Sequence, residues 1–113
     1  MARLSVNQKM KTKFRGSKEW KEFRANMRDK QKVDPITGAK LTRLANLHHL
    51  DLNEDHYTDI SDESHFVFLN QAMHKTVHSL FLKSDPKAWR KRVLALIRIL
   101  KDMEKINSAD RLP

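Results

Sequence analysis

The stretch HHLDLNEDHYTDISDESHFVFLNQAMHKTVH, residues 48–78, contains all six histidines of this 113-residue chain. On a helix, the four-residue spacing of His74 and His78 would place both imidazoles on one face, because four residues is close to one turn. On a strand, His48 and His49 would point to opposite faces of the sheet. One imidazole of this doublet can therefore bind a metal ion together with the helix pair. The other must have a different role, such as accepting a proton from water.

Apolar spacing predicts three helices and two short strands around this stretch. Trp20, Phe23 and Met27, for example, recur at spacings of three and four. The predicted helices cover about residues 18–31, 71–83 and 86–106, and the predicted strands cover about residues 45–50 and 66–69. Residues 1–16 show no clean period and predict an extended or partly ordered basic arm. The pattern indicates a mostly helical α+β fold in a single domain, residues 1–113.

The net charge of +9 is concentrated near the N-terminus. Residues 1–33 carry 11 Lys/Arg against 3 Asp/Glu, a balance of +8, whereas the other 80 residues carry 12 against 11. Contact between such a segment and phosphates releases counterions, so a polyanion such as DNA is the strongest physical partner. A solubilising surface and a contact with anionic lipid are alternative interpretations of the same charge.

The composition excludes several classes of protein. The chain has no cysteine, so it can form no disulfide, no thiolate zinc site and no cysteine nucleophile. No apolar run approaches the roughly 20 residues that a membrane span needs, and the N-terminus lacks the apolar segment of a secretory signal. We therefore expect an intracellular, cytoplasmic protein without a membrane partner.

In chain order, a strand with a His doublet, a loop, a short strand and a helix with His-x-x-x-His resemble the HNH family of ββα-metal endonucleases. The resemblance covers about residues 34–80. It implies a ββα-metal core, a short hairpin plus a helix, flanked by an N-terminal helix and a long C-terminal helix. In that family an Asn, or sometimes a His, stands nine positions before the first helix histidine. Here that position is His65, so the chain is similar to a His-His-His variant.

One feature of the family is missing from the sequence. Many members hold a structural zinc ion with two Cys-x-x-Cys pairs that bracket the core. No cysteine stands at the corresponding positions here, which are Asp34, Thr37, Asn70 and Met73. No structural zinc is therefore expected, and the turn and side-chain hydrogen bonds would have to hold the two ends together.

The resemblance also implies roles for the histidines. His48, His74 and His78 would bind one divalent metal ion, His49 would be the general base, and His65 would support His49. Three imidazoles favour Zn²⁺, Ni²⁺, Co²⁺ or Mn²⁺ thermodynamically, although abundance would allow Mg²⁺ or Mn²⁺ to serve in the cell. Neutral His49 would take a proton from the water that attacks a phosphodiester phosphorus.

The sequence thus predicts a metal-dependent DNA endonuclease, by analogy a phage or mobile-element enzyme. Asp51 could orient an imidazole, or it could be a solvated loop carboxylate. Contacts to the phosphate backbone of DNA are expected from basic residues that could equally be ordinary exposed charges, namely Lys11, Lys13, Arg15, Lys40, Arg43 and Lys75. The alternatives are a non-catalytic nucleic-acid-binding or protein-interaction module on the same fold, and a basic helical nucleic-acid-binding protein without a metal.

Overall fold

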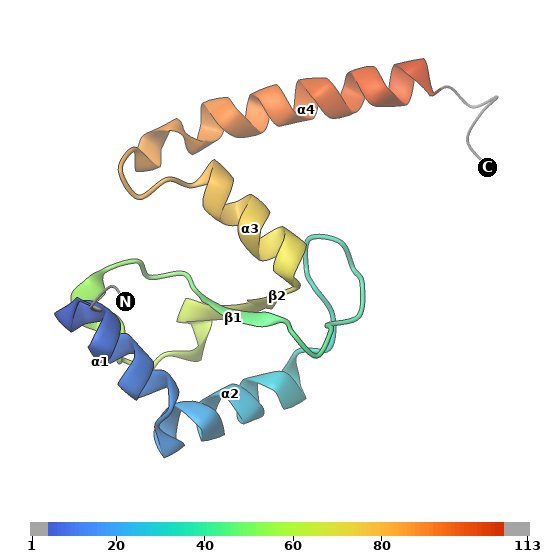
Figure 1. The fold of residues 1–113 in the computed structure, drawn as a ribbon. Helices are drawn as coiled ribbons and strands as arrows, with labels where there is room; N and C mark the ends of the chain where they lie inside the picture. The colour runs from blue at the N-terminus through green and yellow to red at the C-terminus, as the bar shows by residue number, and fades with distance from the viewer. Residues whose placement is uncertain (1–4, 108–113) are drawn as a thin grey trace, which may run out of the picture. The chain divides into compact units, whose positions relative to one another are not determined.

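The computed structural model describes residues 5–107 and has the mostly helical α+β fold that the sequence predicts (Figure 1). Its elements in chain order are α1 Val6–Arg15, α2 Lys18–Lys30, β1 Asn46–His49, β2 Phe66–Leu69, α3 Gln71–Leu80 and α4 Trp89–Ile106. The chain divides into two compact units, residues 1–74 and residues 75–113, and the boundary falls inside α3. The apolar core lies entirely in the first unit.

Helix α1 replaces most of the extended arm that the sequence predicted. The Ser5 side chain accepts from the Gln8 backbone N–H (3.1 Å), and the Gln8 side chain accepts from the Ser5 backbone N–H (2.8 Å). This reciprocal capping box satisfies two free donors of the first turn. Phe14 then packs against the core and lies 5.3 Å from Trp20, ring centre to ring centre. The prediction is wrong for residues 6–15, and residues 1–4 lie outside the described part.

Helix α2 forms as its apolar spacing predicts. The Ser17 hydroxyl accepts from the Trp20 N–H at 3.3 Å and caps the first turn. Trp20, Phe23 and Met27 are buried on the face that points to the hairpin. In Figure 1 this helix lies below the hairpin, and none of its charged residues is buried.

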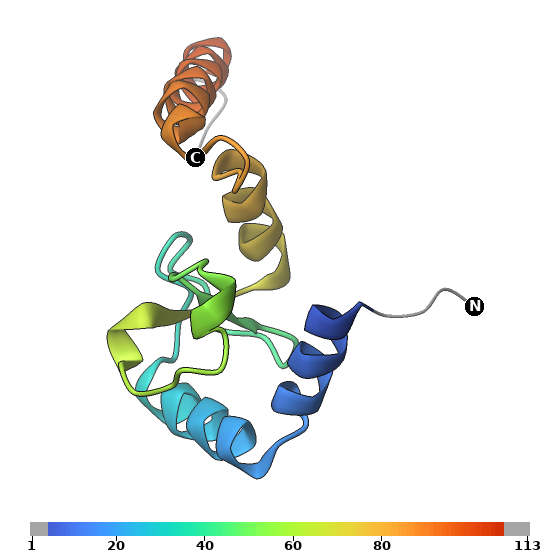
Figure 2. The same ribbon diagram turned by 90° about the vertical axis from the view of Figure 1, so that its left-hand side faces the viewer.

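The two strands form an antiparallel hairpin in which each residue of the His doublet lies on a different face. Leu47 pairs with Phe68, and His49 pairs with Phe66. Cross-strand partners share a face, so these four side chains point to the core under α2. His48 must then point to the other face. Two short 3₁₀ turns, Glu54–His56 and Glu63–His65, lie in the loop between the strands (Figure 2).

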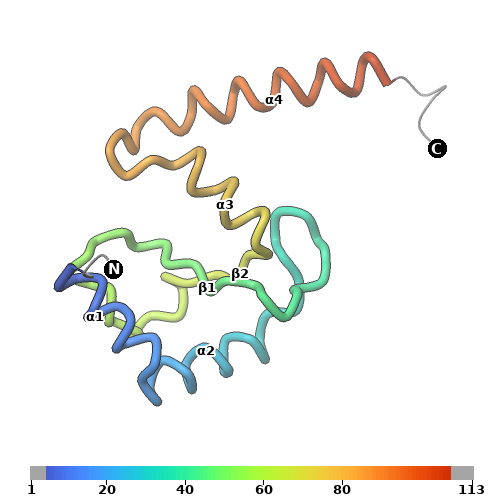
Figure 3. Tube along the Cα trace, viewed as in Figure 1, coloured from blue at the N-terminus to red at the C-terminus, as the bar shows by residue number. Residues whose placement is uncertain are grey.

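The segment between α2 and β1 is held to the start of α3 by the buried carboxylate of Asp34. Figure 3 follows this segment as a wide loop. One carboxylate oxygen of Asp34 accepts from the backbone N–H groups of Ile36 (2.8 Å) and Thr37 (3.3 Å), and the other accepts from that of Asn70 (2.9 Å). The Asn70 side chain donates to the Lys40 carbonyl. Hydrogen bonds therefore join the two segments where the resemblance would place a zinc ion.

The second unit comprises the end of α3, a 3₁₀ turn at Pro86–Ala88 and α4. Arg92 donates to the Leu80 carbonyl at 3.1 Å and lies 3.8 Å from the Asp85 carboxylate, so it ties α4 to the end of α3. None of the described residues of this unit, 75–107, is buried. Among the helices that the structure describes, none is long and apolar enough to cross a membrane.

Candidate metal centre

Three histidines converge, as the sequence predicts. One imidazole nitrogen from each of His48, His74 and His78 lies within 4.8 Å of the others. His48 on β1 is 7% exposed, and its ring centre lies 5.1 Å from that of His74. His78 follows one turn later on α3 and is exposed. The cluster therefore combines one buried imidazole with two imidazoles of a continuous helix.

The donor set fits a single divalent ion. Tetrahedral zinc sites with nitrogen ligands at about 2.0–2.1 Å place those nitrogens about 3.4 Å apart. The nitrogens of the cluster lie within 4.8 Å of one another, so the rings would have to approach further to bind one ion. Imidazole suits Zn²⁺, Ni²⁺, Cu²⁺ and Fe²⁺, whereas Mg²⁺ prefers oxygen. The residues can thus hold a metal ion, and they do not select one metal.

His49 lies on the opposite face, between two aromatic rings. Its ring is nearly parallel to that of Tyr57, with centres 4.5 Å apart and planes at 9°. Trp20 stacks at 5.6 Å and 15°. His49 Nε2 is 3.2 Å from the Tyr57 carbonyl oxygen, which can only accept, so Nε2 carries the proton. A neutral His49 ring then has its lone pair on Nδ1.

The charges around His49 affect its protonation. Burial lowers its pKa, and the positive charges of Lys11 and Arg15 act in the same direction. The hydrogen bond to the Tyr57 carbonyl and the charge of Asp51 raise the pKa in part, but the net shift is downward. The imidazole is therefore neutral over a wider range of pH than an exposed histidine.

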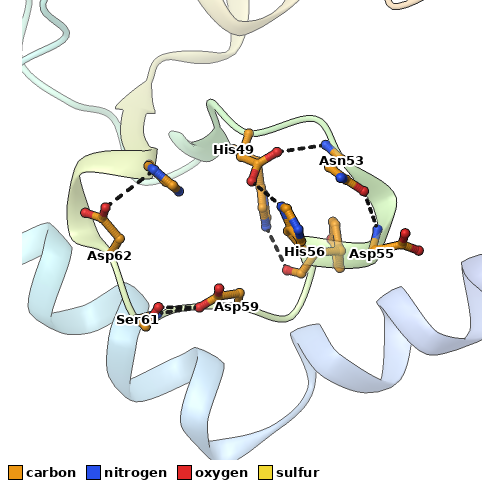
Figure 4. Close-up of polar contacts among 10 residues, drawn as sticks. His49, Asn53, Asp55, His56, Asp59, Ser61 and Asp62 are labelled. Carbon is orange, nitrogen blue, oxygen red and sulfur yellow. Dashed lines mark hydrogen bonds and ion pairs between the residues drawn. The ribbon is translucent and has the colours of Figure 1, made fainter.

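Asp51 orients a histidine that sequence reasoning did not single out. Its carboxylate lies 2.7 Å from Nδ1 of His56, which is on the first 3₁₀ turn of the loop. This hydrogen bond raises the pKa of His56, while the Asn53 N–H and His56 together lower the pKa of Asp51. Figure 4 shows this loop, in which Asp59 also accepts from Ser61. A carboxylate five residues before a histidine was the available sequence signal.

The imidazole of His65 lies beside Asp62 in the loop between the strands. Its imidazole is half exposed, and its Nε2 is 3.4 Å from the Asp62 carboxylate. Its backbone carbonyl accepts from Leu50 at 2.8 Å, which extends the hairpin by one hydrogen bond. Among the contacts of the described residues, His49 is held by Tyr57, Trp20 and Phe66 and not by His65.

The six basic residues expected to contact DNA differ in their surroundings. Lys11 lies 2.6 Å from the Glu54 carboxylate, and Arg15 donates to the Tyr57 hydroxyl at 3.4 Å. Both contacts tie α1 to the loop that holds His49. The remaining four side chains are exposed at positions Lys13, Lys40, Arg43 and Lys75.

Comparison of the chain with protein-family models, with curated proteins and with solved structures gave no match. The resemblance to HNH endonucleases therefore stays a prediction from the residues.

Proposed function

We propose that this protein is a metal-dependent endonuclease that hydrolyses phosphodiester bonds of DNA. The observation that carries the proposal is the division of the His doublet. His48 joins His74 and His78 in a cluster of possible ligands, while the adjacent His49 lies outside the cluster with its tautomer fixed. A site that held a metal only for stability would have no use for such an imidazole.

The chain's own residues supply a general base with a defined orientation. The Tyr57 carbonyl holds the Nε2 proton of His49, so Nδ1 is the atom that takes a proton from the attacking water. The parallel rings of Tyr57 and Trp20 hold the imidazole plane in place. A divalent ion held by the three-histidine cluster would offset the charge that grows on the phosphate oxygens. Attack by water in this way gives a 5′-phosphate and a 3′-hydroxyl.

DNA binding rests on charge. The balance of +8 in residues 1–33 favours contacts to the phosphate backbone without a sequence preference. Lys13 on α1 and Arg43 before β1 are exposed and available for such contacts. We expect the affinity to fall steeply with salt.

The test is cleavage of supercoiled plasmid with Mg²⁺, Mn²⁺, Ni²⁺, Zn²⁺ or EDTA. We expect metal-dependent cutting that His49→Ala slows by about 10²–10⁴-fold, the usual effect of losing a general base. His56→Ala is the matched control, because it removes an exposed imidazole from the loop that follows β1, and it should cut like the wild type. A shift of the melting temperature by metal should persist in His49→Ala and disappear in His74→Ala.

Two results would count against the enzyme. If no metal supports cutting while metal still raises the melting temperature, the chain is a non-catalytic binding module. If His49→Ala and His56→Ala cut equally well, His49 is not the base.

A further inference from the structure

Helix α4 has an apolar stripe that the rest of its unit covers only in part, since Val93 and Leu96 are half-buried and the residues towards the C-terminal end are exposed. Leu100, Met103 and Ile106 are 52%, 54% and 69% exposed, and none of residues 75–107 is buried. An apolar surface that runs along an 18-residue helix usually marks a contact with another molecule.

The spacing of the stripe indicates what covers it. The residues of the stripe are four and three apart, and they are Trp89, Val93, Leu96, Leu100 and Met103. This is the a/d spacing of a two-stranded coiled coil. Ile97 borders the stripe on one flank, and Ile99 and Ile106 border it on the other. The contact surface is therefore wide enough for a second helix.

We infer that α4 docks against α4 of a second copy of this chain, antiparallel, with the two-fold axis beside Arg98. In this register Val93 lies opposite the partner's Met103, and Leu96 lies opposite the partner's Leu100. Each pair occurs twice because of the symmetry. The dimer does not depend on the proposed nuclease activity.

The flanks decide between the antiparallel and the parallel arrangement. In the antiparallel register Ile97 meets the partner's Ile97, and Ile99 meets the partner's Ile99. Arg90 faces the partner's Glu104, and the two-fold symmetry repeats this contact, so the dimer contains two ion pairs. In a parallel dimer, by contrast, Ile99 would face the partner's Glu104, and Arg92 would face the partner's Ile97. Charge complementarity therefore favours the antiparallel pair.

Arg92 also fits this register. It lies opposite the partner's Ile106, but its guanidinium already donates to Leu80 and lies beside Asp85 in its own chain. The charge is thus partly offset within the chain, and the aliphatic part of the side chain can cover the isoleucine.

An anionic membrane surface is the other partner that a basic amphipathic helix can have. Glu104 argues for a second copy, because it lies at the edge of the stripe, where its carboxylate would meet anionic headgroups. In the dimer the same carboxylate meets Arg90 of the partner.

The test is sedimentation equilibrium of the full chain at rising concentration. We expect the mass to rise from 13.3 kDa towards twice that value at about 100 μM, in the range of a small, reversible interface. Leu100→Glu should weaken the dimer by at least about 100-fold, because two charges would be buried. Leu94→Glu is the matched control, since Leu94 is 66% exposed on the same helix and lies off the stripe.

Charge exchange tests the register itself. Arg90→Glu should weaken the dimer by roughly tenfold, and adding Glu104→Arg should restore it, because the ion pair is rebuilt only in the antiparallel arrangement. A monomer at every concentration would overturn the inference, as would equal weakening by Leu94→Glu and Leu100→Glu. Binding to vesicles with anionic lipid by a protein that stays monomeric would assign the stripe to a membrane instead.

Discussion

Asp34→Asn is the substitution that most directly tests how the first unit is held together. The side chain of Asp34 is fully buried, and its two oxygens accept three backbone N–H groups at 2.8–3.3 Å. Asparagine has the same shape but only one acceptor oxygen. Its amide NH₂ must face either the N–H of Asn70 or those of Ile36 and Thr37. In either orientation the side-chain NH₂ faces at least one backbone N–H group, and neither group has an acceptor.

The cost follows from the number and kind of hydrogen bonds. A hydrogen bond to a charged group contributes about 1.5–3 kcal/mol, and an unsatisfied buried donor costs about 1–3 kcal/mol. The hydrogen bonds to one oxygen would be lost and those to the other would weaken, because the side chain is no longer charged. Together these changes should lower the free energy of unfolding by about 3 kcal/mol. Stability of about 0.05–0.15 kcal/mol per residue gives roughly 4–11 kcal/mol for the unit of 74 residues, so the variant should keep only about 1–8 kcal/mol and unfold at a clearly lower urea concentration.

Urea unfolding followed by circular dichroism and tryptophan fluorescence measures this loss. Asp29→Asn is the matched control, because Asp29 is an exposed carboxylate on α2, and its variant should unfold within about 0.5 kcal/mol of the wild type. If Asp34→Asn also unfolded within that margin, the Asp34 carboxylate would not be what joins the two segments.

Three further predictions concern the same unit. Burial alone would raise the pKa of Asp34, but the N–H groups of Asn70, Ile36 and Thr37 lower it below its ordinary value of 3.8. The stability that this carboxylate contributes is therefore present above pH 3.8 and lost as the pH falls below it. An acid titration should show a shallower loss of stability for Asp34→Asn than for the wild type. Gly38 has φ +72°, so Gly38→Ala should cost about 1 kcal/mol in thermal unfolding and Gly38→Asn less, and equal costs would contradict the left-handed turn. Phe68 is fully buried, so Phe68→Ala should cost about 3–5 kcal/mol in urea unfolding, and a loss below 1 kcal/mol would contradict its place in the core.

The parts of the molecule that the sequence predicted are those set by local periodicity. A strand separates His48 from His49 because adjacent residues alternate, and a helix aligns His74 with His78 because four residues make about one turn. Both rules apply to a few residues at a time. The convergence of His48 with the helix pair needed one more assumption, the order of the elements, and the structure confirms that the three rings lie close together.

The parts that the sequence did not predict depend on partners far along the chain or on unpatterned backbone. Asp34 and Asn70 are 36 residues apart, and nothing in the pattern around either residue indicates the other. The Tyr57 carbonyl that binds His49 is a backbone group, which every residue has. Helix α1 was missed for a different reason, because the capping box formed by Ser5 and Gln8 precedes a segment without a clean apolar period.

The Asp34–Asn70 contact also links the stability of the first unit to the geometry of the metal centre. Asn70 is fixed at three points, since its N–H donates to Asp34, its side chain donates to the Lys40 carbonyl, and its side-chain oxygen accepts from Thr42. Its carbonyl then accepts from the N–H of His74 at 2.9 Å, in the first turn of α3. The position of His74 relative to His48 therefore depends on a carboxylate that binds no metal. Loss of the Asp34–Asn70 contact would move His74, so the affinity for metal should fall. A ligand that binds only the folded state stabilises it, so the free energy of unfolding in the presence of metal should fall with that affinity.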